Sequence, residues 1–188
     1  DLIEKKDLRA VYPKKFGDLQ VRIEPPLPTV GTDLLEVFHS PAVHQAMLSF
    51  FQGNYRILWV SIYRTIPAAR VVSSWLWHCD GYPPRTCKLF LHLTPATAET
   101  GATEFMNLED TMAYRQAGYF GQHLGERYAD LEDFARSHHL PYRPFHFDVT
   151  PGDATVFDMN FFHRAISPRT TFRDVVQFYL LPNPIPWD

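Results

Sequence analysis

The alternation of apolar and polar positions divides this chain of 188 residues into a helical start and a longer β region. Residues 19–23 alternate as a short strand, which the prolines at 25, 26 and 28 end. Residues 32–38 and 42–51 then follow a helical pattern, and Ser40 and Pro41 precede the second segment as an N-cap residue and a first-turn proline do. We therefore expect helices packed on the outside of a sheet.

From residue 55 onward the pattern has a period of two. Residues 56–63, 70–77 and 86–94 read as strands joined by short turns with Pro or Gly, which favours antiparallel pairing over βαβ units. Residues 108–140 interrupt this pattern with helical segments at 108–117 and 130–139, and four more short strands end at Pro182. About eight strands in two facing sheets make a mainly β fold, the cupin-like jelly roll or double-stranded β-helix.

The length of the chain sets its domain organisation. A chain of 188 residues can bury one sizeable core but is too short for two ordinary domains. We expect residues 1–188 to form a single double-stranded β-helix domain, with residues 1–54 as helical support. The insertion at 108–140 would be a lid over the mouth of the barrel or an outer buttress without contact to substrate, and the pattern does not decide between them.

Charge and composition exclude several classes of function. The net charge is −3, and Lys and Arg are scattered, so a basic surface for nucleic acid is not expected. No apolar run approaches the roughly 20 residues of a membrane span, and no signal-peptide pattern opens the chain, although it begins at Asp1 without Met. The two cysteines, Cys79 and Cys87, favour a reducing cytoplasm; a disulfide between them is the alternative.

Two His-x-Asp pairs are candidate metal ligands, His78 with Asp80 and His146 with Asp148. In an extended strand, residues two apart share a face, so either pair could offer an imidazole and a carboxylate to one ion. The first pair ends an apolar run and is followed by a turn at 81–84, which places it at a strand end. The second pair is interpreted as ordinary strand residues, and Cys79 is expected to point away from the first pair's face.

A distant histidine and an arginine complete the pattern. Two histidines and one carboxylate hold Fe(II) on one face in non-haem oxygenases, and His163 follows a turn and an apolar strand. Arg173 begins the apolar strand 173–181, where an unpaired guanidinium is costly and an anion is required. That anion would be the far carboxylate of 2-oxoglutarate or a structural partner, Asp158 or Asp174.

Five segments in order resemble the phytanoyl-CoA dioxygenase-like branch of the Fe(II)/2-oxoglutarate oxygenases: residues 77–84, 88–94, 101–105, 152–153 and 163–165. The resemblance covers about the C-terminal two-thirds of the chain. It implies a double-stranded β-helix in which His78, Asp80 and His163 hold the iron. It also implies that Arg173 anchors 2-oxoglutarate, with Arg169 as the second candidate. The chain departs from the pattern at 106–108, where relatives usually carry a Gly-Ser-His turn, and at Ala165, where many carry a hydroxyl that helps to bind 2-oxoglutarate.

The activity implied by this resemblance is that of a dioxygenase, typically a hydroxylase, which uses Fe(II), 2-oxoglutarate and O₂ and releases succinate and CO₂. We expect a small organic substrate with an apolar or aromatic portion. Lys88 shares a strand face with Phe90 and His92; it faces the barrel and binds an anion of 2-oxoglutarate or substrate, or it is a solvated strand residue. The rival functions are a jelly-roll module that binds a small ligand without turnover and a cupin-type dioxygenase that does not use 2-oxoglutarate.

Overall fold

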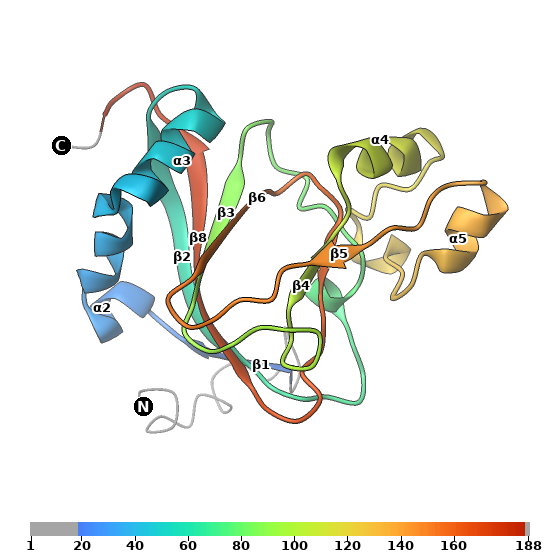
Figure 1. The fold of residues 1–188 in the computed structure, drawn as a ribbon, viewed down its shortest axis with the longest axis horizontal. Helices are drawn as coiled ribbons and strands as arrows, with labels where there is room; N and C mark the ends of the chain where they lie inside the picture. Colours follow the sequence, from blue (N-terminus) through green and yellow to red (C-terminus); the bar gives the residue numbers. More distant parts are fainter. Residues whose placement is uncertain (1–18, 187–188) are drawn as a thin grey trace.

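The computed structural model describes residues 19–186, which form two antiparallel sheets that face each other (Figure 1). The larger sheet has the strand order β1-β2-β8-β3-β6 and the smaller one the order β5-β4-β7. The strands of the larger sheet are β1 (Gln20–Ile23), β2 (Tyr55–Thr65), β3 (Cys87–His92), β6 (Ala154–Asp158) and β8 (Arg173–Pro182). Those of the smaller sheet are β4 (Thr103–Phe105), β5 (Phe145–His146) and β7 (His163–Ala165). This arrangement confirms the predicted jelly roll.

Strand β8 lies at the centre of the larger sheet, between β2 and β3. It pairs with β2 from Tyr55 opposite Pro182 to Thr65 opposite Arg173, with one bulge between Ile57 and Trp59. Both neighbours satisfy its backbone groups, so the start of β8 is held rigidly. Arg173 is the first residue of this strand.

The first helices cover the outer face of the larger sheet (Figure 1). They are α2 (Pro26–Val30), the 3₁₀ helix η3 (Asp33–His39) and α3 (Pro41–Phe51), which begins after Ser40 as predicted. Phe38 of η3 packs edge-on against Phe178 of β8, with ring centroids 5.0 Å apart. The expected helices on the outside of a sheet are thus confirmed within residues 19–54, and residues 1–18 lie outside the described part of the chain.

The insertion builds a second core beside the smaller sheet (Figure 1). It contains α4 (Leu108–Gln116), the 3₁₀ helix η5 (Leu124–Glu126) and α5 (Glu132–Ser137), close to the two predicted helical segments. Asn107 caps α4 by accepting a hydrogen bond from the backbone N–H of Asp110 at 2.7 Å. The buried members of this core are Trp77, Cys79, Met106, Tyr114, Tyr119, Leu131, Ala135 and Phe162.

The predicted strand at 70–77 is wrong. This segment contains the 3₁₀ turn η4 (Ser73–Trp75) and no strand. The next residue, His78, joins the smaller sheet through a single bridge to His163. Ser73 has φ 56°, which breaks the extended conformation, and its carbonyl accepts a hydrogen bond from Arg127 Nη1 at 3.3 Å. A tertiary contact from the insertion therefore stabilises a turn that the period-two pattern conceals.

The two cysteines are free and lie in different cores, Cys87 in the first and Cys79 in the second. The alternative disulfide is therefore absent. Among residues 19–186, no helix combines the length and the apolar composition that crossing a bilayer requires.

Candidate metal centre

Three candidate ligands meet where the segment after η4 pairs with the start of β7. The backbone N–H of His78 donates to the carbonyl of His163 at 3.0 Å, and that of His163 donates to the carbonyl of His78 at 2.9 Å. The N–H of Asp80 donates to Met159 O at 3.0 Å. This pairing brings ligand atoms of His78, Asp80 and His163 within 4.8 Å of one another, and within residues 19–186 no other group of three or more such side chains does so.

Backbone carbonyls fix the orientation of both imidazoles. Nδ1 of His78 donates to Leu76 O at 2.7 Å, and Nδ1 of His163 donates to Phe161 O at 2.8 Å. The proton therefore resides on Nδ1, and each Nε2 presents a lone pair to the centre. Nε2 of His163 is buried and has no hydrogen-bond partner. Two preoriented lone pairs beside a carboxylate are what a divalent metal requires.

Burial and neighbouring charges set the protonation states of His78 and Asp80. Burial holds the pKa of His78 well below its usual value, and the adjacent His163 lowers it further. Burial alone would raise the pKa of Asp80, but Lys88 Nζ, 2.7 Å from Asp80 Oδ2, outweighs it and holds this pKa well below the usual range. At neutral pH His78 is thus neutral and Asp80 anionic, the forms that bind a metal.

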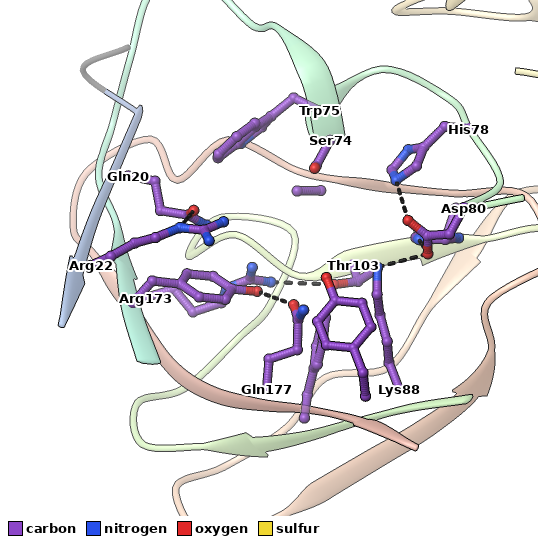
Figure 2. A pocket seen from close by; sticks show the side chains of 15 residues that line it. Gln20, Arg22, Ser74, Trp75, His78, Asp80, Lys88, Thr103, Arg173 and Gln177 are labelled. Atoms are coloured by element: carbon purple, nitrogen blue, oxygen red, sulfur yellow. Dashed lines mark hydrogen bonds and ion pairs between the residues drawn. The ribbon is translucent and has the colours of Figure 1, made fainter. Parts of the chain in front are cut away.

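The triad lies at one end of a pocket between the two sheets, and Arg173 lies in its wall (Figure 2). The pocket has an empty volume of about 540 Å³ including the space at its mouth. Arg173 is 2% exposed; its Nη1 donates to Gly101 O at 2.6 Å and to Thr103 Oγ1 at 3.3 Å. Its Nε is buried without a hydrogen-bond partner, and burial lowers its pKa.

Neither Asp158 nor Asp174, the two structural partners considered for Arg173, forms an ion pair with it. Asp174 forms a two-point ion pair with Arg64, both contacts at 2.8 Å, and Asp158 Oδ1 accepts from the N–H of Asn160 at 2.8 Å. No carboxylate of the described residues lies within ion-pair distance of Arg173. The pocket therefore contains a buried cation whose counter-charge must come from elsewhere.

Lys88 faces the pocket and is 6% exposed, so the solvated alternative is wrong (Figure 2). Its Nζ forms the ion pair with Asp80 and lies 5.1 Å from the centroid of the Tyr179 ring. Burial alone would lower the pKa of Lys88, but Asp80 raises it overall, so the ammonium stays charged. Phe90 lines the same pocket, whereas His92 lines a neighbouring cavity with Thr155.

Two candidates lie outside this pocket. The side chain of Arg169 is 72% exposed and pairs with Glu99 at 3.2 Å. His146 and Asp148 pair at 3.4 Å on the outer strand of the smaller sheet, with side chains 31% and 69% exposed. Cys79 points away from the triad, as expected, and its Sγ donates to Phe120 O at 3.0 Å.

The sequence reading missed several pocket residues. Gln177 and Tyr179 line the pocket on the same face of β8 as Arg173, and a polar stripe at positions i, i+4 and i+6 of an apolar strand was the available signal. Gln20 and Arg22 of β1 also line it. Their alternation with apolar residues reads as a solvated face, because periodicity alone does not distinguish a pocket from solvent.

The chain resembles known proteins in its three-dimensional structure alone. No family model matches the chain, and no curated protein matches it. Among solved structures, HygX from Streptomyces hygroscopicus with nickel and 2-oxoglutarate bound matches with TM-score 0.61 and 12% identity, over 93% of this chain and 74% of that one. The non-haem α-ketoglutarate-dependent carbocyclase SnoK from nogalamycin biosynthesis matches with TM-score 0.60 and 15% identity, over 87% and 64%. EctD from S. alaskensis with bound Fe matches with TM-score 0.58 and 13% identity, over 87% and 57%.

The fold and the site together define a class. The chain has the double-stranded β-helix fold of the Fe(II)/2-oxoglutarate-dependent oxygenases, which confirms at the level of fold the resemblance found in its motifs. Within that fold, His78, Asp80 and His163 form a triad that fits an Fe(II) site. The chain spans only 36% of the length of EvdMO1 and 64% of that of SnoK, two of the structures that it matches.

Proposed function

We propose that this chain is a non-haem Fe(II)- and 2-oxoglutarate-dependent oxygenase that hydroxylates or otherwise oxidises a small organic molecule. One observation carries the proposal. A triad of two preoriented histidines and a carboxylate shares a pocket with a buried arginine that has no carboxylate partner among the described residues. The triad offers the ligands that a metal needs, and the buried arginine suits a dianionic co-substrate.

In this proposal Nε2 of His78, Nε2 of His163 and the carboxylate of Asp80 hold the iron. When bound, Fe(II) couples the oxidation of the substrate by O₂ to the conversion of 2-oxoglutarate into succinate and CO₂. The two backbone carbonyls that accept from Nδ1 keep both rings in the ligating tautomer. Lys88 neutralises one oxygen of Asp80 and adds positive charge beside the place where 2-oxoglutarate would chelate.

Arg173 would bind the far carboxylate of 2-oxoglutarate. A guanidinium offers two parallel N–H groups to a carboxylate, and Nε of Arg173 is without a partner. Ala165 lacks the hydroxyl that many relatives carry, but Thr103 stands directly opposite it in the pairing of β4 with β7. The hydroxyl of Thr103 already contacts Arg173 at 3.3 Å, so we infer that it takes over this role.

The pocket wall opposite β8 suits a small substrate with an acceptor group. Ser74 and Trp75 of η4 line the pocket, and Trp75 is 2% exposed with its indole N–H unpartnered (Figure 2). A buried indole N–H without a partner favours a ligand that accepts a hydrogen bond. The pocket lies between the two sheets, which favours a small molecule over a polymer.

We also infer a cytoplasmic location and action without nucleic acid. Two free and buried cysteines suit a reducing compartment, and the net charge of −3 offers no phosphate-binding surface.

The test of the proposed activity is succinate release. The protein, loaded anaerobically with Fe(II) and then given 2-oxoglutarate and air, should release succinate, and a true substrate in a panel of small acids and aromatics should accelerate that release. His163→Ala should abolish it. A protein that binds panel members without succinate release would instead be a binding module.

A further inference from the structure

The segment that carries His78 and Asp80 is buried on both sides. Successive side chains of this segment point to opposite faces. His78 and Asp80 point to the pocket, and Trp77 and Cys79 point into the second core, where both are 0% exposed. One edge of the segment pairs with β7 through His78. Its contacts with the insertion therefore determine how firmly the ligands are held.

The insertion hydrogen-bonds this segment where a neighbouring strand would otherwise pair. The N–H of Trp77 donates to Tyr128 O at 2.8 Å, and the carbonyl of Trp77 accepts from the hydroxyl of Tyr119 at 2.7 Å. The thiol of Cys79 donates to Phe120 O at 3.0 Å. Residues on both sides of His78 are thus bonded to the stretch 119–128.

Tyr119 connects the two ligand-bearing segments. It is 4% exposed, and its ring lies 5.1 Å from that of Phe162, the residue before His163. Burial raises the pKa of Tyr119 to about 12, so its hydroxyl remains a donor to Trp77 at every pH of interest. One side chain therefore contacts the neighbours of both histidines.

Gly121 allows the insertion to approach His78 closely. Its φ is +60°, and a Cβ there would lie 3.0 Å from Cα of His78 and 3.1 Å from the carbonyl oxygen of Trp77. Both atoms are backbone, so a side chain at 121 would displace the ligand segment itself.

The second ligand segment is held by α4. The hydroxyl of Thr111 accepts from the N–H of Phe162 at 3.2 Å, and Arg115 Nη2 donates to Asn160 O at 2.7 Å. By contrast, none of the residues that line the pocket comes from 108–140. The contacts with Trp77, Cys79 and Phe162 are thus made from behind the metal centre, and Arg127 also bonds to Ser73, which precedes the pocket residues Ser74 and Trp75.

We propose that residues 108–140 position the metal ligands from behind, as a scaffold rather than a lid, and that Tyr119 and Gly121 are the positioning residues for His78. The inference rests on the proposed function only in taking His78 as a metal ligand. It predicts that damage to these contacts weakens metal binding, although neither residue lines the pocket.

The first test compares Tyr119→Phe with Tyr114→Phe. Tyr114 lies in the same core, is 0% exposed and donates its hydroxyl to Pro141 O at 3.0 Å, just after the insertion and away from the ligand-bearing segments. Both variants lose a buried hydroxyl that donates to a carbonyl; that of Tyr119 also accepts a long hydrogen bond from the N–H of Tyr128 at 3.4 Å, so Tyr119→Phe should lose as much stability to urea as Tyr114→Phe or slightly more. In anaerobic calorimetric titration with Fe(II) alone, Tyr119→Phe should bind about tenfold more weakly or worse, and Tyr114→Phe should bind as the unaltered protein does.

The second test uses glycines. Gly121→Ala should weaken Fe(II) binding, whereas Gly118→Ala should not, because Gly118 has a similar positive φ of +94° but no heavy atom within 4 Å of an added Cβ. If Gly121→Ala fails to fold, the test is the Fe(II) affinity of Tyr119→Phe compared with that of Tyr114→Phe. Equal Fe(II) affinity of Tyr119→Phe and Tyr114→Phe would overturn the scaffold. Absence of Fe(II) binding by the unaltered protein would overturn the proposed function, and the scaffold with it.

Discussion

At the scale of single residues, Arg173 is a buried cation without a carboxylate partner among the described residues. Replacing it with Leu removes a charge-assisted contact from a buried carboxylate, which costs on the order of 2–5 kcal/mol. We therefore expect Arg173→Leu to weaken apparent 2-oxoglutarate binding by roughly thirtyfold to several thousandfold. The measurement is the dependence of succinate release on 2-oxoglutarate concentration.

Arg169→Leu is the matched control, since Arg169 is exposed and paired with Glu99 outside the pocket. It should change the 2-oxoglutarate requirement by less than about twofold. Equal losses in the two variants would show that the anchor is misassigned, and no loss in either would favour a dioxygenase that does not use 2-oxoglutarate.

His92 gives a prediction for pH. Burial, followed by the charge of Arg173, lowers its pKa to about 4 from 6.5. Between these values the unfolded chain binds the proton and the folded chain does not, so stability is lost as pH falls through this window. The His92 contribution amounts to about 3 kcal/mol at most.

His92→Gln removes this titration and keeps a group that can reach Thr155, which His92 Nε2 contacts at 3.0 Å. Urea unfolding at pH 6.5 and pH 4 should show a smaller loss for the variant than for the unaltered protein. Identical losses would mean that His92 is protonated in the folded chain.

Sequence spacing was sufficient to select His78, Asp80 and His163, which the fold brings together, whereas the role of Arg173 as an anchor stays a prediction. The role of Lys88 was left open, since strand alternation gives a face but not what that face meets. Its contact with Asp80 depends on how the segment 78–80 folds against β3. Gln20 and Arg22 were missed for the same reason, as their polar face borders a pocket rather than solvent.

At the scale of elements, the pairing of β2 with β8 holds the start of β8, and the ion pair of Arg64 with Asp174 lies across it. Both side chains are nearly buried, at 10% and 12% exposed. Asp174→Asn removes the carboxylate of this nearly buried ion pair and should destabilise the fold by about 3 kcal/mol, measured by urea unfolding.

Asp133→Asn provides the control, because Asp133 pairs with Arg136 at 3.0 Å while 94% exposed. Its effect should stay within about 0.5 kcal/mol. A loss of stability in Asp174→Asn as small as this would show that β2 and β8 hold their register without the ion pair.

Most elements were predictable from periodicity, including α3, the strands after residue 140 and both helices of the insertion. The failure at 70–77 has a specific cause. Ser73 adopts a positive φ and is bonded by Arg127, more than fifty residues later, which no local pattern encodes. The scaffold role proposed for residues 108–140 likewise depends on distant contacts, those of Tyr119 and Gly121 with the segment at 77–78, which no local pattern encodes.

At the scale of the whole molecule, the candidate centre lies between two cores, and two buried cations line its pocket. Lys88 pairs with Asp80, whereas Arg173 has no carboxylate partner among the described residues. The charge of Arg173 therefore favours an anionic ligand in the pocket of a net acidic chain.

Anaerobic visible spectroscopy can detect iron and 2-oxoglutarate bound together at the candidate centre. Fe(II) and 2-oxoglutarate added together to the metal-free protein should produce a weak charge-transfer band that neither produces alone. His78→Ala should lose the band, and His146→Ala, altered in the other His-x-Asp pair, should keep it. Absence of the band in the unaltered protein, or its loss in His146→Ala but not in His78→Ala, would contradict the assignment of His78, Asp80 and His163 as the iron ligands of a 2-oxoglutarate-dependent oxygenase.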